Sequence, residues 1–214
     1  MSIPAILARR LLSEITSKAD EAGKPTRLVS SALNLDSFSL YSRAGFVPHT
    51  TFQDILVSVP EERLDVPSGD GVRDATLDDL AAIVDLEAQV AGIHRERDWA
   101  YFIENVRGIW HVSIAIGASG NVDGVLASVG HPGSRIVGPG VMRNEETAID
   151  LSVAELDHHR GQTVLLLVPA LARDLLGSVY AWGGRNCEIH FAQCRGEYAP
   201  SQGVVMPTFM PETG

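Results

Sequence analysis

The stretch Asn34 to Pro48, NLDSFSLYSRAGFVP, is the most informative part of the chain for its fold. Residues 36–44 are compatible with a helix. Gly45 follows directly, at a place where glycine commonly ends a helix in the left-handed backbone conformation. The stretch therefore predicts a short helix that ends in the pattern Tyr-x-x-x-Gly-Phe, formed by Tyr41, Gly45 and Phe46.

Helical and strand patterns alternate on both sides of this stretch. Leu7, Leu11 and Ile15 recur at every fourth position, which predicts a helix that Gly23 and Pro25 end. Residues 26–31 (TRLVSS) and 52–59 (FQDILVSV) have the composition of strands.

A polar segment rich in Pro, Gly and charge, residues 60–71, has the composition of a linker. We therefore predict a first domain at 1–60, a linker at 61–71 and a second domain at 72–214. Asn144 is expected to cap a helix. The second domain is predicted to hold strands at 72–76, 111–117, 122–129, 135–142 and 163–168, two more within 188–209, and helices that begin near 78, 95, 144 and 171.

The segment 34–48, with the helix and the strand TRLVSS before it, resembles the GCN5-related N-acetyltransferases (GNAT) over roughly residues 3–59. The runs VRDATLDDLAAIVDLE, IVGPGVMRNEETA and TVLLLVPA extend the resemblance over roughly residues 70–182. It implies an α/β (α+β) fold of tandem GNAT type, with a mixed, mostly antiparallel twisted sheet flanked by helices. Residues 1–60 correspond to the C-terminal half of one GNAT domain, because the family's pyrophosphate loop would stand before Met1.

The resemblance also implies a function, the transfer of an acetyl group from acetyl-CoA to a primary amine, with no metal. Tyr41 and Tyr180 would then be the candidate general acids, because a phenol can protonate the departing thiolate. The alternative is that Tyr41 packs one face of its helix, with Phe46 as a core residue behind it, and that Tyr180 packs in the core. Six residues are implied for cofactor binding: Ser30, Asn34, Ser37, Gly138, Gly140 and Arg143.

Two departures from the family pattern weaken the resemblance of the second region to a cofactor-binding GNAT domain. The match to Arg-x-x-Gly-x-Gly contains Pro139, which has no N–H to offer a phosphate, and Arg185 stands where the family has Phe. A second hypothesis is therefore a non-catalytic GNAT-fold module for binding or dimerisation.

A third hypothesis is a zinc site at Cys187, His190 and Cys194. It ranks last, because positions 187 and 190 of a strand point to opposite faces. His158 and His159 are expected to interact with the C-terminal dipole of the helix that they close.

Composition narrows the class of partner. The net charge of −10 argues against nucleic acid as the main partner. The sequence contains no run of about 18 apolar residues, so no membrane helix is expected. The first ten residues lack the pattern of a secretory signal, and two cysteines imply no disulfide framework, so a cytoplasmic protein is expected. The expected partners are a small-molecule or peptide amine and, to complete the sheet, a second copy of the chain.

Overall fold

The computed structural model describes residues 3–66, 69 and 71–208, with side chains from Leu7 onward. The chain forms two compact units. Unit 1 comprises the residues up to Phe52 together with Glu188–Ala199, and unit 2 comprises Gln53–Cys187 with the residues from Pro200. Both units are discontinuous in sequence, because the chain passes from unit 1 to unit 2 after Phe52 and returns to unit 1 at Glu188. Each of these two boundaries lies within a strand. The division predicted from the sequence, with a domain at 1–60, a linker at 61–71 and a second domain at 72–214, remains a prediction. Residues 67, 68 and 70 of this linker lie outside the described residues.

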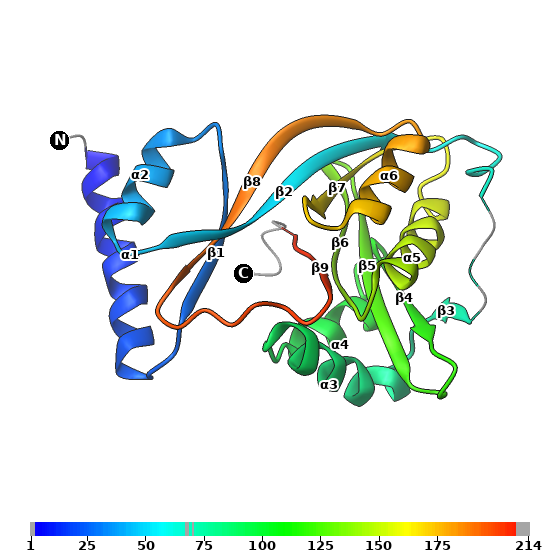
Figure 1. Cartoon of the computed structure of the whole chain (residues 1–214), viewed down its shortest axis with the longest axis horizontal. Helices are drawn as coiled ribbons and strands as arrows, with labels where there is room; N and C mark the ends of the chain where they lie inside the picture. Colours follow the sequence, from blue (N-terminus) through cyan, green and yellow to red (C-terminus); the bar gives the residue numbers. More distant parts are fainter. Residues whose placement is uncertain (1–2, 67–68, 70, 209–214) are drawn as a thin grey trace. The chain divides into compact units, whose positions relative to one another are not determined.

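Unit 1 holds α1 (Ile3–Glu21), β1 (Thr26–Ser31) and α2 (Leu35–Arg43), with the first part of β2 (Val47–Ser58) and the last part of β8 (Arg185–Arg195). β1 pairs antiparallel with β8, from Thr26 opposite Arg195 to Ser31 opposite His190. Gly45 has a φ of +89°, which confirms the left-handed end expected for α2. Figure 1 shows the two helices beside these strands.

Unit 2 contains the larger part of the sheet. Its strands lie in the order β2, β7, β6, β5, β4, β3, and β9 pairs with β6. Most neighbours are antiparallel, while β6 and β7 are parallel. The elements not yet given are β3 (Val72–Asp74), η1 (Leu77–Asp79), α3 (Leu80–Ala91), α4 (Glu96–Glu104), β4 (Trp110–Ile116), β5 (Val122–His131), β6 (Ser134–Met142), α5 (Glu145–Asp157), β7 (Thr163–Pro169), α6 (Arg173–Ala181) and β9 (Val204–Met206).

Side chains alternate across this sheet and build one hydrophobic core on each face. In β6, Ile136 and Val141 join the core under α3 and α4, whereas Val137 and Met142 join the core under α5 and α6. Figure 1 shows the two helix pairs around the strands of unit 2. The predicted fold class, a mostly antiparallel mixed sheet flanked by helices, is confirmed.

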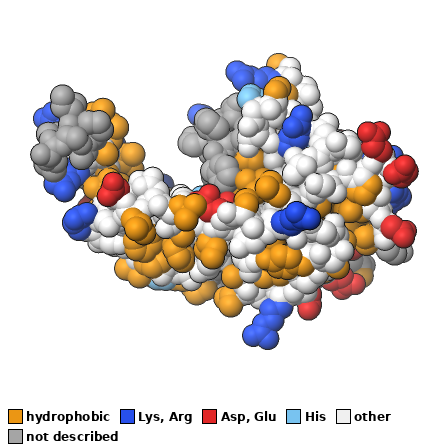
Figure 2. Space-filling view, turned by 90° about the horizontal axis from the view of Figure 1, so that it is seen from above, with side chains coloured by type: hydrophobic (Ala, Val, Ile, Leu, Met, Phe, Trp, Pro, Cys, Tyr) orange, Lys and Arg blue, Asp and Glu red, His pale blue; other side chains and the backbone are white. Residues whose placement is uncertain are grey.

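The apolar stripe of α1 has a different environment. Leu7, Leu11 and Ile15 are each more than half exposed, although a helix stripe of this spacing usually faces a core. Hydrophobic side chains are visible at several places on the surface in Figure 2. Within the described part of the chain, no helix is long and apolar enough to span a membrane.

A buried ion pair between α3 and α4 was not foreseen from the sequence. The Glu87 carboxylate is fully buried and accepts hydrogen bonds from Arg95 at 2.5 and 3.0 Å and from the Trp99 indole at 3.0 Å. The Arg95 guanidinium also lies 5.7 Å from the centre of the Trp99 ring. The pair therefore joins the two helices, and the hydrogen bonds to the carboxylate offset the free-energy cost of burying its charge.

Candidate functional site

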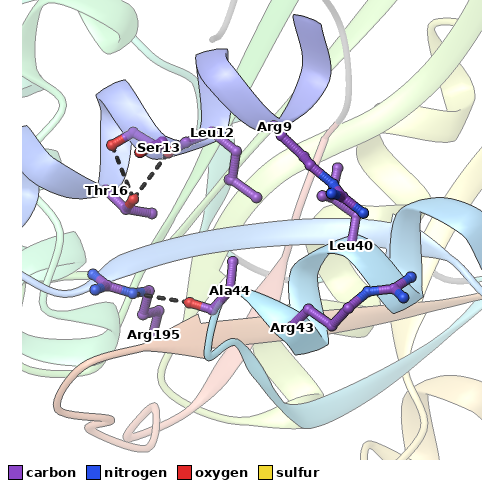
Figure 3. Close-up of a pocket in the computed structure, with 8 residues that line it drawn as sticks. All are labelled: Arg9, Leu12, Ser13, Thr16, Leu40, Arg43, Ala44 and Arg195. Carbon is purple, nitrogen blue, oxygen red and sulfur yellow. Dashed lines mark hydrogen bonds between the residues drawn. The ribbon is translucent and has the colours of Figure 1, made fainter. Parts of the chain in front are cut away.

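Unit 1 contains a pocket of about 400 Å³ between its two helices. Helix α1 contributes Arg9, Leu12, Ser13 and Thr16, and α2 with the residue after it contributes Leu40, Arg43 and Ala44; Arg195 of β8 completes the lining. Figure 3 shows the arginines and the aliphatic side chains of this pocket. We call it the arginine pocket.

The three arginines of the pocket differ in what they bind. Arg195 donates to the Ala44 carbonyl at 3.0 Å and to both oxygens of Asp20 at 2.5 and 2.9 Å. The hydrogen bond from Arg195 lowers the pKa of Asp20, so the pair is ionised and its charges balance. Arg9 and Arg43 have no ion-pair partner among the residues that the structure describes. The pocket thus offers two uncompensated positive charges, which suits an anion.

The Tyr-x-x-x-Gly-Phe ending places Tyr41 beside the pocket in sequence but not in its lining. The half-buried Tyr41 ring meets Phe46 edge to face, with 5.9 Å between the ring centres. Its hydroxyl has no hydrogen-bond partner in the described part of the chain. Tyr41 therefore packs against the buried Phe46, as the alternative to a catalytic role predicts, and its phenol hydroxyl stays free among the described residues.

Three further predicted cofactor residues lie in unit 1. Asn34 caps α2, because its side-chain oxygen accepts a hydrogen bond from the Ser37 N–H at 3.0 Å. The Ser30 hydroxyl is buried and accepts from the Gln193 amide at 2.6 Å. The side chains of Asn34 and Ser30 thus have structural partners, and Ser37 contributes its backbone N–H; contacts of the three residues with a cofactor remain predictions.

The second tyrosine, Tyr180, lies in α6 of unit 2. Its ring is partly exposed, and its hydroxyl donates to the Gln53 side-chain oxygen. This contact fixes the phenol group in place. A role as general acid would require the hydroxyl to leave Gln53, and that role remains a prediction.

Gly138 and Gly140 lie inside strand β6 and are buried. A methyl group on Gly140 would come within 2.3 Å of the Leu126 side chain and 2.9 Å of the Val125 carbonyl oxygen. At Gly138, where φ is +134°, it would come within 2.6 Å of the Pro207 carbonyl oxygen. Close packing against β5 therefore accounts for Gly140, and the positive φ with the nearby Pro207 carbonyl accounts for Gly138, while cofactor binding by both stays a prediction.

The N-termini of α5 and α6 in unit 2 already have protein acceptors. The Asn144 side chain accepts from the Thr147 N–H at 2.8 Å, which confirms the predicted cap of α5. The Glu145 carboxylate accepts from the N–H groups of Asp174 and Leu175 at 2.7 and 3.0 Å and so caps α6. These groups would compete with a phosphate for the same N–H donors.

Arg143, the last of the predicted cofactor residues, also has protein partners. It donates to Asp123 at 3.2 Å and to the Gln89 side chain at 2.7 Å. Its guanidinium is partly exposed, so one face remains accessible from solvent. A contact with cofactor phosphate remains a prediction.

Cys187, His190 and Cys194 of strand β8 do not together form a ligand cluster within the described residues, contrary to the zinc hypothesis. Cys187 is exposed and donates to the Asp54 carbonyl, whereas Cys194 is buried, with the carbonyls of Arg195 and Glu197 as the two acceptors within reach of its single S–H. Both thiols are free, so no disulfide forms between them.

Comparisons with known proteins give matches in structure only: no family model and no curated protein matches the chain. A candidate acetyltransferase of Pyrococcus horikoshii superposes over 99% of this chain and 66% of its own, with a TM-score of 0.70 and 15% identity. A GCN5-related N-acetyltransferase of Sphaerobacter thermophilus superposes over 89% of this chain and 63% of its own, with a TM-score of 0.51 and 15% identity. The chain has the GNAT fold.

A more distant similarity is to a protein whose structure contains a bound acyl-CoA. The N-myristoyltransferase of Saccharomyces cerevisiae, with myristoyl-CoA bound, superposes over 95% of this chain and 58% of its own, with a TM-score of 0.50 and 8% identity. This chain therefore spans about two thirds or less of the length of these three structures. At such low identity the similarity concerns the fold, and activity has to be argued from the site.

Proposed function

We propose that this chain is an acyl-CoA-dependent N-acyltransferase, or a remnant of one, that binds acetyl-CoA and acylates a primary amine. The observation that carries the proposal is the arginine pocket between α1 and α2 in a protein of GNAT fold. Coenzyme A carries three phosphate groups on an otherwise largely uncharged molecule. Arg9 and Arg43 can bind a phosphate through paired N–H donors, while Leu12 and Leu40 contact the uncharged part.

The positive charge of the arginine pocket contrasts with the negative charge of the protein as a whole. The chain carries a net charge of −10, so an anion is repelled by the protein as a whole and needs local positive charge to bind. Arg9 and Arg43 supply that charge, while Arg195 holds Ala44 and Asp20 and shapes the pocket. A pocket of about 400 Å³ accommodates a part of coenzyme A rather than the whole molecule.

The proposed chemistry is direct acyl transfer. The neutral amine nitrogen attacks the thioester carbonyl, a C–N bond forms and the C–S bond breaks; the sulfur takes a proton from a general acid and leaves as a thiol, while the nitrogen loses a proton to solvent. Tyr41 and Tyr180 are the candidate donors of the proton to the sulfur. Tyr41 is favoured by its free hydroxyl, since the Tyr180 hydroxyl is engaged by Gln53.

Titration calorimetry with acetyl-CoA tests the binding step. We expect saturable binding that the double substitution Arg9→Ala and Arg43→Ala weakens about tenfold or more, since each lost charge-assisted hydrogen bond contributes about 1.5–3 kcal/mol. Arg10→Ala is the matched control, because Arg10 is exposed on the same helix and does not line the pocket. Equal binding by the double variant and the control would remove the pocket from the proposal.

Release of free thiol from acetyl-CoA in the presence of small and peptide amines tests the chemical step. Tyr41→Phe should reduce the rate of thiol release without changing acetyl-CoA binding if its phenol supplies the proton. Tyr180→Phe is the parallel variant for the second candidate.

The alternative is a GNAT-fold module without catalysis that binds or dimerises. It is favoured by the caps of α5 and α6, because Asn144 and Glu145 already occupy N–H groups that could hold a phosphate. Absence of acetyl-CoA binding up to about 1 mM, a concentration that corresponds to only about 4 kcal/mol of binding free energy, would favour this module. Light scattering would then show whether the module forms a homodimer.

A further inference from the structure

A second group of polar side chains lies in unit 2, outside the arginine pocket. It is formed where α5 packs on strands β4 and β5, with β3 at the edge. Its members are Asp74 of β3, His111 of β4, Ser128 of β5, Glu155 of α5, and His158 and His159 at the end of α5. His111 and Ser128 stand directly opposite each other in the β4–β5 ladder, so both side chains face α5.

The centre of this group is the Glu155 carboxylate, which is fully buried. One oxygen accepts a hydrogen bond from Ser128 Oγ at 2.5 Å, and the other lies 2.9 Å from His111 Nδ1. The Ser128 hydroxyl has a single hydrogen, which it gives to Glu155, so its contact with His159 Nε2 at 3.0 Å is one that His159 donates. Three donors therefore fix the orientation of Glu155, Ser128 and His111.

This hydrogen bonding also sets the direction of Nε2, the other ring nitrogen of His111. Because Nδ1 donates its proton to Glu155, the other nitrogen, Nε2, points outward, 3.3 Å from Asp74 Oδ1, and in the neutral ring it offers a lone pair to a metal ion. An imidazole held from behind by a buried carboxylate is the arrangement in which histidine commonly binds metal ions. His158 lies against the same ring, with 3.4 Å between the ring centres.

We propose that Asp74, His111 and His158 bind a divalent transition-metal ion of the zinc type, with Glu155 and Ser128 orienting His111. One ligand atom from each of the three residues lies within 4.8 Å of the others. Ligands of a tetrahedral zinc ion lie about 3.3 Å apart, given bonds of about 2.0–2.1 Å. Asp74 and His158 are exposed, so their side chains can rotate to bring the ligand atoms to that spacing. The site departs from the expectation, drawn from the family resemblance, that no metal is needed.

The donor set also limits the type of ion. Two imidazoles and one carboxylate suit zinc and its neighbours in the first transition row, whereas calcium and magnesium prefer oxygen ligands. Three protein ligands leave a fourth position open to water or to a ligand from solution, as in catalytic rather than structural zinc sites.

The test uses the full chain without an affinity tag, freed of metal with a chelator. Calorimetric titration with Zn²⁺ should give one site per chain, and His158→Ala should weaken binding about tenfold or more. His94→Ala is the matched control, since His94 is an exposed histidine of unit 2 outside the group. His158 is itself exposed, so its replacement should leave the fold intact, which circular dichroism checks.

A second readout distinguishes a built site from binding at scattered histidines. Co²⁺ should give the intense visible absorption of a low-symmetry four-coordinate site in the wild-type chain, and His111→Ala should abolish it. Ser128→Ala changes no ligand, yet it should weaken Zn²⁺ binding about tenfold, because it loosens the carboxylate that orients His111. Absence of saturable Zn²⁺ binding below about 1 mM, or equal binding by His158→Ala and His94→Ala, would overturn the proposal.

Discussion

At the scale of the residue, glycine has two different uses in unit 2. Gly140 is required by packing, because Leu126 and Val125 of the neighbouring strand fill the space where a side chain would begin. Gly177 lies within α6, and a methyl group there would meet nothing within 4 Å. The same residue type therefore contributes close strand packing at one position and only backbone freedom at the other.

These two glycines give a matched pair of substitutions. Gly140→Ala should destabilise the protein by about 2–3 kcal/mol, because the new methyl overpacks the β5–β6 contact. Gly177→Ala should stabilise it by about 0.5–1 kcal/mol, because alanine is the better helix former and the site is open. Urea denaturation of both variants measures the difference. Two variants of equal stability would contradict the packing account of Gly140.

At the scale of the element, the start of η1 depends on one carboxylate. Asp79 accepts from the Thr76 N–H at 2.9 Å and from the Thr76 hydroxyl at 3.0 Å, and Arg73 donates to its two oxygens at 2.7 and 2.8 Å. The hydrogen bond from Arg73 is the main cause that lowers the pKa of Asp79 to about 2. This carboxylate therefore joins β3 to η1 and to the start of α3.

The lowered pKa predicts how this contribution depends on pH. A carboxylate whose folded-state pKa lies below its unfolded value of about 3.9 contributes its stability above that value, and the contribution is lost as pH falls toward about 2. Asp79→Asn should cost about 1 kcal/mol at pH 7 and less at pH 3. Urea denaturation at both pH values measures this. Asp78→Asn is the control. An equal loss of stability in Asp79→Asn at both pH values would show that the charge of Asp79 is not the source of its contribution to stability.

At the scale of the whole molecule, the two units differ in how much hydrophobic core they contain. Both core clusters consist of residues from unit 2, on the two faces of its sheet. In unit 1, helix α2 buries none of its residues, and the apolar stripe of α1 is exposed. Burial of apolar area is the main source of stability, so unit 1 should open at a lower free energy than unit 2.

Hydrogen exchange of the native protein tests this difference. Amide protons of α1 and α2 should exchange about tenfold or more faster than those of β5, β6 and α5, because each 1.4 kcal/mol of opening free energy changes exchange tenfold. Mass spectrometry after peptic digestion resolves the two units. Uniform protection across both units would contradict the idea that unit 1 opens separately.

The sequence by itself determined the elements and the fold class. Helical periodicity, the glycine after α2, the Asn144 cap and the apolar run of β7 depend on contacts between near neighbours in the chain, and such contacts can be read locally. The Tyr-x-x-x-Gly-Phe ending added the resemblance to GNAT proteins, and structural comparison confirmed the fold. The spacing of Glu155, His158 and His159 on one helix face was also visible in the sequence.

Only the tertiary structure decided which distant residues meet. Glu155 becomes an orienting group because the register of β4 and β5 places His111 beside Ser128, and β3 brings Asp74 to the same edge. Arg9, Arg43 and Arg195 form a pocket because α1, α2 and β8 converge, although more than 150 residues separate the first two from the third. Strand register and helix packing are set by contacts between segments far apart in sequence, and no local pattern encodes them.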